Sequence, residues 1–295
     1  MRKPIANRET YESFFKVLKD EFIIKELQSR ANNLNEKRGM PIAVFGNDWI
    51  GLNLNIHGLY EKEYLADLKN LLSVIGIDTA NSTAIDIGAN IGNHAIEFSS
   101  YFNKVICFEP NPRTFDVLEA NAKQVKNIDV NNWGCASSQQ YLKLQEDFNN
   151  IGGSHVSMEI EGKNYAEILV KPLDESIDSM SAVSLIKIDV EGMEIEALKG
   201  ADKVISKFHP VICLEQHQSE FSQNIHETES IAWLRSKGYR IFSLCQPKSK
   251  ILRRLNKLTH IAFGIKRKRK IIEFKKLPKA TYPMIYAIHP LSLDK

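Results

Sequence analysis

Acidic side chains stand near the ends of several short apolar segments, and these are the positions where the sequence is equipped for chemistry. Asp86 lies within the first segment, Glu109 directly follows the second, and Asp189 and Glu215 close two later ones. Short apolar segments bounded by glycine, proline and polar clusters are typical of buried strands. Ligands of open α/β sheets bind at the carboxyl ends of the strands. We therefore expect these carboxylates to lie around one site.

The turn after the first strand predicts the kind of ligand. It reads Asp-Ile-Gly-Ala-Asn-Ile-Gly over residues 86–92 and leads into a helix-like stretch. A dinucleotide-binding loop needs glycine at three positions, where this chain has Gly88, Asn90 and Asn93. A side chain at position 90 would occupy the space of a pyrophosphate, and the phosphate-binding G-K-[ST] motif is absent. A nucleoside without phosphates fits better, so we expect S-adenosylmethionine as cofactor, bound by Asp86, Gly88, Asn90 and Gly92.

Three later residues complete the expected cofactor site. Glu109 stands 21 residues after Gly88, where a doubly wound sheet places an acid on the ribose hydroxyls. The alternative is an acid that stabilises the start of the helix at Pro112. Gly134 and Cys135 follow the third strand and are expected beside the adenine ring, because small residues allow the backbone to approach it closely.

The pattern of predicted helices and strands divides the chain into two parts. Residues 1–58 indicate an N-terminal cap, with a helix to about residue 38 and a β-hairpin over 42–56. Residues 59–295 indicate a mostly parallel α/β sheet domain with a basic insert at about 246–281. A helix from Glu61 to about Ser73 precedes the strands. The predicted strands are 84–87, 104–108, 128–133, 184–190, 210–215, 239–244 and 284–289.

Composition indicates a globular protein that stays in the cytoplasm. The chain has 295 residues, 43% of them hydrophobic and 25% charged, which is ordinary for a folded domain. No apolar run reaches the length of a membrane span, and the first residues lack the apolar core of a signal peptide. The four cysteines are far apart and have neither disulfide-like nor zinc-ligand spacing, so we expect reduced thiols.

The positive charge is concentrated in one segment. Between Lys248 and Lys279 there are thirteen Lys or Arg and one acid, Glu273, although the net charge of the chain is only +3. Apolar residues at helical spacing over 251–261 lie among these charges, and a basic run follows at 266–270. This pattern predicts peripheral contact with an anionic membrane surface, the inner face in a cytoplasmic protein. A nucleic-acid partner and a solvated hairpin are the alternatives.

Six motifs, taken in order, resemble the FkbM family of S-adenosylmethionine-dependent methyltransferases. The resemblance runs from roughly Leu59 to Leu244 and leaves out residues 1–58 and the basic insert. It implies a Rossmann-like class I methyltransferase fold, with seven strands of which the last is antiparallel. It also implies O-methylation of a sugar or related hydroxyl in a glycan or natural product. The motifs are DIGANIG (86–92), FEPNP (108–112), GGS (152–154), IKIDVEGME (186–194), LKGA (198–201) and PVICLE (210–215).

The reaction that this resemblance implies needs a base, because a sugar hydroxyl is a weak nucleophile. His217 is the strand-end residue whose type titrates nearest neutrality, whereas a carboxylate base needs a raised pKa. His155 is the last residue of a glycine-rich loop, 149–155, that is predicted to act as a lid; an exposed loop histidine without a role is the alternative. The candidate catalytic residues are Asp189, Glu191, Glu215, His217 and His155.

Several alternatives stay open at this point. Lys187 shares a strand face with Asp189, and we expect it to form a structural ion pair with an acid. Asp189 and Glu215 are a possible Mg²⁺ ligand pair, but two carboxylates are few ligands, and we expect no metal. A nucleic-acid methyltransferase and a non-catalytic cofactor-binding regulator are the competing functions. Amino-methylating nucleic-acid enzymes carry an Asn- or Asp-Pro-Pro-aromatic element where this chain has Asp189-Val190-Glu191-Gly192, which argues against nucleic acid.

Overall fold

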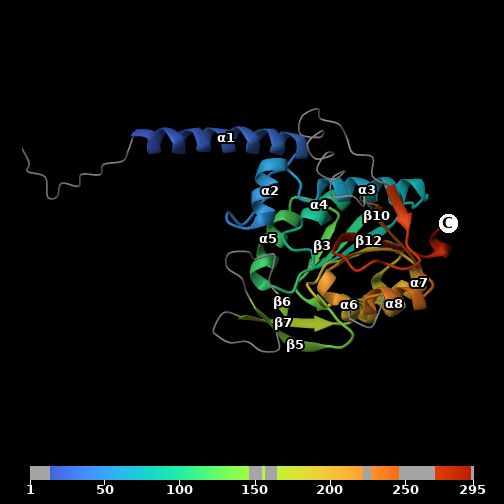
Figure 1. The fold of residues 1–295 in the computed structure, drawn as a ribbon. Helices are drawn as coiled ribbons and strands as arrows, with labels where there is room; N and C mark the ends of the chain where they lie inside the picture. The colour runs from blue at the N-terminus through green and yellow to red at the C-terminus, as the bar shows by residue number, and fades with distance from the viewer. Residues whose placement is uncertain (1–13, 146–154, 157–164, 222–226, 246–269, 294–295) are drawn as a thin grey trace, which may run out of the picture. The chain divides into compact units, whose positions relative to one another are not determined.

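The computed structural model describes residues 14–145, 155–156, 165–221, 227–245 and 270–293. The chain divides into two compact units, Met1–Tyr60 and Glu61–Lys295 (Figure 1). Three predicted features lie outside the described residues: residues 149–154 of the lid loop predicted at 149–155, the apolar stripe at 251–261 and the basic residues 266–269. Within the described part, no helix is both long and apolar enough to cross a membrane.

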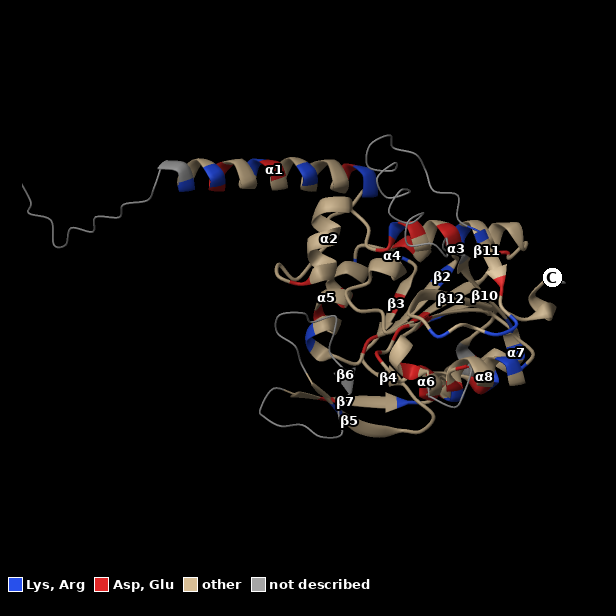
Figure 2. Cartoon of the chain, in the orientation of Figure 1, with Lys and Arg blue, Asp and Glu red and all other residues tan. Residues whose placement is uncertain are grey.

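The first unit contains two helices, α1 (Phe14–Arg38) and α2 (Trp49–His57). Basic and acidic side chains are interspersed along α1 (Figure 2), and Arg30 pairs with Glu26 one turn away. The helix predicted up to about residue 38 is confirmed over its described part. The hairpin predicted over 42–56 is wrong, because its second half is α2.

The physical reason for this difference is the cap of α2. The carboxylate of Asp48 accepts hydrogen bonds from the backbone N–H groups of Ile50 and Gly51, at 3.0 and 3.2 Å. An aspartate in this position satisfies donors that the first turn of a helix leaves free. At the other end, Gly58 has a φ of 81° and its N–H donates to the carbonyl of Leu54. Asp48, in the middle of the segment predicted as a hairpin, therefore starts a helix.

The second unit is built on an eight-stranded sheet with the order β11-β10-β12-β9-β8-β1-β2-β3. The five strands from β9 to β3 in that order run parallel, and β12 is antiparallel to both β9 and β10. The predicted mostly parallel sheet with an antiparallel last strand is confirmed. The strands are β1 (Thr83–Ile87), β2 (Lys104–Phe108), β3 (Ile128–Asn131), β8 (Val183–Ile188), β9 (Val211–Gln216), β10 (Arg240–Cys245), β11 (Lys270–Glu273) and β12 (Tyr282–Ile288).

All seven predicted strands are present, and their ends differ from the predicted ends by at most two residues. The eighth strand, β11, was not predicted and lies within the expected basic insert. It pairs antiparallel with β10, with Cys245 opposite Lys270. The basic insert is therefore partly an edge strand of the sheet, and charged residues are common on such edges.

Helices cover both faces of the sheet, with α3, α4 and α5 on one side and α6, α7 and α8 on the other (Figure 1). Apolar residues of the last three helices recur at three- and four-residue steps and join one core with the strands, such as Ala197, Val204 and Ile231. The helices are α3 (Lys62–Val74), α4 (Asn93–Ser99), α5 (Pro112–Ala122), α6 (Glu194–Gly200), α7 (Asp202–Phe208) and α8 (Glu229–Ser236), with 3₁₀ turns at Leu173–Ser179, Gln218–Glu220 and Pro290–Ser292.

A second, smaller sheet has the order β4-β7-β5-β6 and was not predicted. In this sheet β4 and β7 are parallel, while β5 is antiparallel to both β7 and β6. Its strands are β4 (Gly134–Cys135), β5 (Gln140–Gln145), β6 (His155–Val156) and β7 (Tyr165–Lys171). His155 therefore belongs to a strand, opposite Gln145, and not to the loop in which it was predicted.

The centre of the fold is β1, whose five residues are all buried. Cys107, Cys135 and Cys213 are buried and free, as expected for reduced thiols. Burial raises the pKa of each of these thiols, so they remain protonated and behave as small core residues.

Candidate active site

The loop after β1 packs against the end of β8, and this contact requires glycine at position 88. Gly88 has a φ of 75°. A Cβ atom there would lie 1.8 Å from the carbonyl oxygen of Asp189, a distance that no pair of non-bonded atoms adopts. The close approach of two neighbouring strand ends, together with the tight turn, therefore explains this glycine.

Asn90 and Gly92 carry the chain from this turn into α4. Asn90 has a φ of 50°, in the left-handed region that asparagine tolerates better than most residues. Its side-chain oxygen accepts a hydrogen bond from the N–H of Ile91 at 2.7 Å. Gly92 has a φ of 90°, and a Cβ atom there would lie 2.9 Å from Leu118 of α5. The loop thus has a single well-defined path between strand and helix.

Glu109 connects this loop to the one that follows β2. Its two carboxylate oxygens accept hydrogen bonds from the backbone N–H groups of Asn90 and Asn111, each at 2.9 Å. Burial raises the pKa of the Glu109 carboxyl group to about 7, although the two hydrogen bonds and Lys187 act in the opposite direction. The cap of α5 is Asn111, which accepts from the N–H of Arg113. The N-cap of α5 is therefore Asn111 and not Glu109.

The groups around this loop fit S-adenosylmethionine. A carboxylate has about four acceptor positions, and Glu109 uses one on each oxygen. Each oxygen therefore has an unused acceptor position for a hydroxyl group of the ribose. The carboxylate oxygens of Asp86 are buried and accept no hydrogen bond from the described residues, although Lys187 lies 3.3 Å from one of them. Acidic groups at this end of the strands complement the ammonium and sulfonium groups of the cofactor.

A buried lysine neutralises part of the acidic charge at the same edge. Lys187 Nζ lies 3.3 Å from Asp86 Oδ1 and 3.3 Å from Asp189 Oδ2. It also donates a hydrogen bond to the carbonyl of Gly88 at 3.1 Å. Burial alone would lower the pKa of Lys187, but the two aspartates raise it above its usual value. The structural ion pair expected for Lys187 is confirmed, and it ties β8 to β1 and to the loop.

Glu215 at the end of β9 is the strongest base candidate in this cluster. Burial and the neighbouring charges of Asp189, Glu61 and Glu191 raise the pKa of its carboxyl group to about 8. The side chain is 27% exposed, so it is shielded from water but reachable. His217 Nε2 lies 3.5 Å from Glu215 Oε1, and the His217 side chain is 42% exposed. The carboxylate therefore acquires the near-neutral pKa that the sequence assigned to histidine.

Two residues that sequence reasoning missed extend this cluster. Glu61 stands directly before α3 with a φ of 54°, and its Oε2 lies 3.2 Å from His94 Nε2. His94 is buried in the first turn of α4. The charge of Glu61 also raises the pKa of both Glu215 and Lys187. The sequence offered one signal, the Gly92-Asn93-His94 run directly after the cofactor loop.

The remaining predicted site residues in this unit are Glu191, Gly134 and Cys135. Glu191 is exposed in the turn after β8, with a φ of 50°, and that turn is held by Glu194, which accepts from the N–H of Gly192. A Cβ atom on Gly134 would lie 3.1 Å from Val170 and 3.3 Å from Pro110. Cys135 is part of the main core. The contacts of these two residues within the protein account for their small size.

The described residues contain no group of three or more His, Cys, Asp or Glu arranged to hold a metal ion. Asp189 and Glu215 stand at the ends of adjacent strands, and the charge of Asp189 raises the pKa of Glu215.

Comparison with known proteins agrees with this geometry. The model of the methyltransferase FkbM domain matches residues 86–241, more than half of the chain. The chain belongs to the FkbM methyltransferase family. The match includes the loop after β1, Glu109, Lys187 and Glu215, so the cluster described above lies within the FkbM domain except for Glu61. S-adenosylmethionine is accordingly its cofactor.

Individual relatives are similar to only part of this chain. Hexuronic acid methyltransferase AglP of Haloferax volcanii is 33% identical over 132 residues, covering 43% of this chain and 53% of that protein. Methyltransferase sdnD of Sordaria araneosa is 27% identical over 177 residues, covering 48% of this chain and 66% of that protein. The matched parts thus span between about half and two thirds of these relatives. A crystal structure of an FkbM methyltransferase from Methylobacillus flagellatus is 24% identical, covers 46% of this chain and 33% of that one, and has a TM-score of 0.35.

Proposed function

We propose that this protein transfers a methyl group from S-adenosylmethionine to a hydroxyl group of a sugar or a related small molecule. The observation that carries the proposal is Glu215, a half-buried carboxyl group whose pKa of about 8 suits a general base. A sugar acceptor is supported by the similarity to a protein named as a hexuronic acid methyltransferase.

In this mechanism the protein positions the reactants and removes one proton. When bound, S-adenosylmethionine supplies an electrophilic methyl group. Glu109 holds the ribose, and the Lys187 ion pairs fix the ends of β1 and β8 relative to each other. Glu215 would accept the proton of the acceptor hydroxyl as the hydroxyl oxygen takes the methyl group, and the methyl carbon–sulfur bond of the donor would break to leave S-adenosylhomocysteine. Alignment of this kind contributes about 7–11 kcal/mol to lowering a barrier, and general-base assistance contributes roughly 10²–10⁴-fold in rate.

His217 is the second candidate for the base, since it lies beside Glu215 at the same strand end. Its greater exposure argues for a supporting role, such as passing the proton to solvent. His155 belongs to the smaller sheet, and the proposal assigns it no role.

The proposal is tested by incubating the protein with S-adenosylmethionine labelled in its methyl group and three separate acceptor pools. These are a polysaccharide and lipid-glycan extract, a small-molecule sugar mixture, and total nucleic acid. We expect label in a sugar-containing pool, as a base-stable methyl ether. Label in nucleic acid alone would favour the competing methyltransferase function. Cofactor binding without transfer to any pool would favour a regulator.

A further inference from the structure

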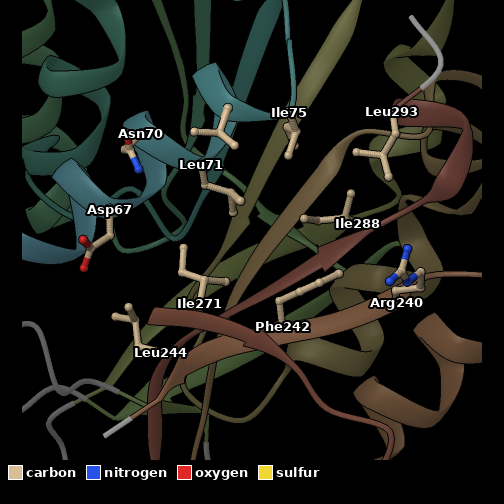
Figure 3. Close-up of a pocket in the computed structure, with 11 residues that line it drawn as sticks. Asp67, Asn70, Leu71, Ile75, Arg240, Phe242, Leu244, Ile271, Ile288 and Leu293 are labelled. Carbon is tan, nitrogen blue, oxygen red and sulfur yellow. The ribbon is translucent and has the colours of Figure 1, made fainter. Parts of the chain in front are cut away.

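A groove between α3 and one end of the sheet is not used by the mechanism above. Its volume is about 450 Å³, within the range of pockets that bind small molecules. Figure 3 shows Leu71 of α3 and Ile75, directly after that helix, on one side, facing residues of β10, β11 and β12. These are Phe242, Ile271 and Ile288. The polar residues of the lining are Asp67, Asn70 and Arg240. Arg240 is paired with Glu273, which leaves a mainly apolar groove.

The groove leads towards the candidate active site. It is lined by β10 from Arg240 to Leu244, and β10 runs parallel to β9 because both are antiparallel to β12. Leu244 and Glu215 therefore both lie near the carboxyl ends of their strands, on the same side of the sheet's long axis. On the opposite wall, Asp67 is one helical turn from Tyr64, and charges of Asp67 and Glu215 both act on the Tyr64 hydroxyl. The end of the groove is thus close to the proposed base.

Positive charge stands at this end of the groove. Lys270 is exposed and pairs with Cys245 at the carboxyl end of β10. An anionic group at the mouth of the groove would be attracted to this charge. A phosphate-linked lipid combines such a group with a hydrocarbon chain.

We propose that this groove binds the hydrocarbon chain of a lipid-linked saccharide, and that its hydroxyl-bearing head is presented to Glu215. The inference rests on the proposed O-methyltransferase function and narrows its substrate class to amphiphilic acceptors. Val74 and Leu293 line the groove and are 74% and 42% exposed. A bound chain would cover such exposed apolar surface, which favours burial.

The test is a calorimetric titration of the full-length protein, without methyl donor, using dodecyl maltoside below its critical micelle concentration and maltose as the head group alone. We expect dodecyl maltoside to bind and maltose to bind at least about a hundred-fold more weakly, because only the former buries methylene groups. Equal affinity of the two ligands would overturn the proposal and would favour a protein segment as the occupant of the groove.

Two variants locate the binding. Val74→Glu on α3 and Ile271→Glu on the edge strand β11 each place a charge in the groove, and each should weaken dodecyl maltoside at least about ten-fold. The matched control is Tyr141→Glu, an exposed apolar position on β5 (67% exposed), which should leave the affinity unchanged. Undiminished binding in both groove variants, or an equal loss in the control, would overturn the proposal. Because Val74 is largely exposed, we expect the Val74→Glu variant to fold. Binding of S-adenosylmethionine by that variant checks that it has folded. The titration contains no methyl donor and measures only binding in the groove. A negative result would therefore overturn the lipid proposal without contradicting the methyl-transfer proposal.

Discussion

Lys187 Nζ lies 3.3 Å from the carboxylate of Asp86, and both side chains are at most 5% exposed. The pair stands on neighbouring strands, β8 and β1, directly below the cofactor loop. A buried ion pair is weak evidence of net stabilisation, but removal of one partner leaves an uncompensated buried charge.

Replacement of this lysine should therefore destabilise the protein strongly. We expect Lys187→Met to lower the free energy of unfolding by about 3–5 kcal/mol, measured by urea denaturation at pH 7. Lys199→Met, which removes an exposed ion pair with Glu196, should cost less than about 1 kcal/mol. Addition of Asp86→Leu to Lys187→Met should recover much of the loss. If Lys187→Met were as stable as the parent, the pair would not have the structural role assigned to it.

The pH dependence of methyl transfer should report Glu215. A base acts in its deprotonated form, and the pKa of Glu215 is raised to about 8. The value of kcat/KM should therefore rise with pH through a midpoint near 8 and level off above it. Glu215→Gln should lower the rate roughly 10²–10⁴-fold and abolish this rise.

Two further results would identify other mechanisms. Loss of the pH dependence in His217→Gln, with its retention in Glu215→Gln, would assign the base to His217. Loss of the rate on adding a chelator, with recovery on adding Mg²⁺, would favour a metal held by Asp189 and Glu215. We expect neither outcome.

Gly88 should tolerate substitution much less than a second glycine with similar backbone. Gly88→Ala combines a left-handed φ with a Cβ atom 1.8 Å from the carbonyl of Asp189. Gly192→Ala has a φ of 99° but no atom within 4 Å of the added carbon. The control should lose about 1–2 kcal/mol from conformation alone, and Gly88→Ala should lose clearly more or fail to fold. Equal melting temperatures would show that the loop does not approach β8 as described.

Binding to anionic vesicles should depend on the basic segment. Deletion of the whole segment would also remove β11, so charge replacement is the better test. We expect co-sedimentation with phosphatidylglycerol vesicles to fall when Lys266, Arg267, Lys268 and Arg269 are replaced by glutamine. Replacement of Lys16, Lys19, Lys25 and Arg30 on α1 is the control with an equal change in charge. The same loss from both sets would contradict a specific role of the segment.

The strands and the cofactor loop were predictable because their signals are local. A buried strand is a short apolar run, and the turn at Gly88 is punctuated by residues with special backbone preferences. The same applies to the order of the motifs, which predicts Glu109, Asp189 and Glu215 at strand ends.

The features that were missed depend on contacts between distant residues. The segment 49–56 has no strong helical periodicity, and its helix depends on the cap by Asp48. Glu61 lies in a non-helical conformation ahead of α3, and only the fold brings it beside His94, 33 residues later. The raised pKa of Glu215 likewise results from burial and from three acids on other segments, so residue type alone favoured His217.

The central claim is that Glu109 binds the ribose of S-adenosylmethionine, and the most direct measurement is a calorimetric titration of that cofactor into Glu109→Ala. Glu119→Ala on α5, which removes only an exposed pair with Lys123, is the control. We predict that Glu109→Ala weakens cofactor binding at least about ten-fold, as expected for loss of charge-assisted hydrogen bonds, while the control binds like the parent. A Glu109→Ala protein that folds and binds the cofactor as tightly as the parent would contradict the account.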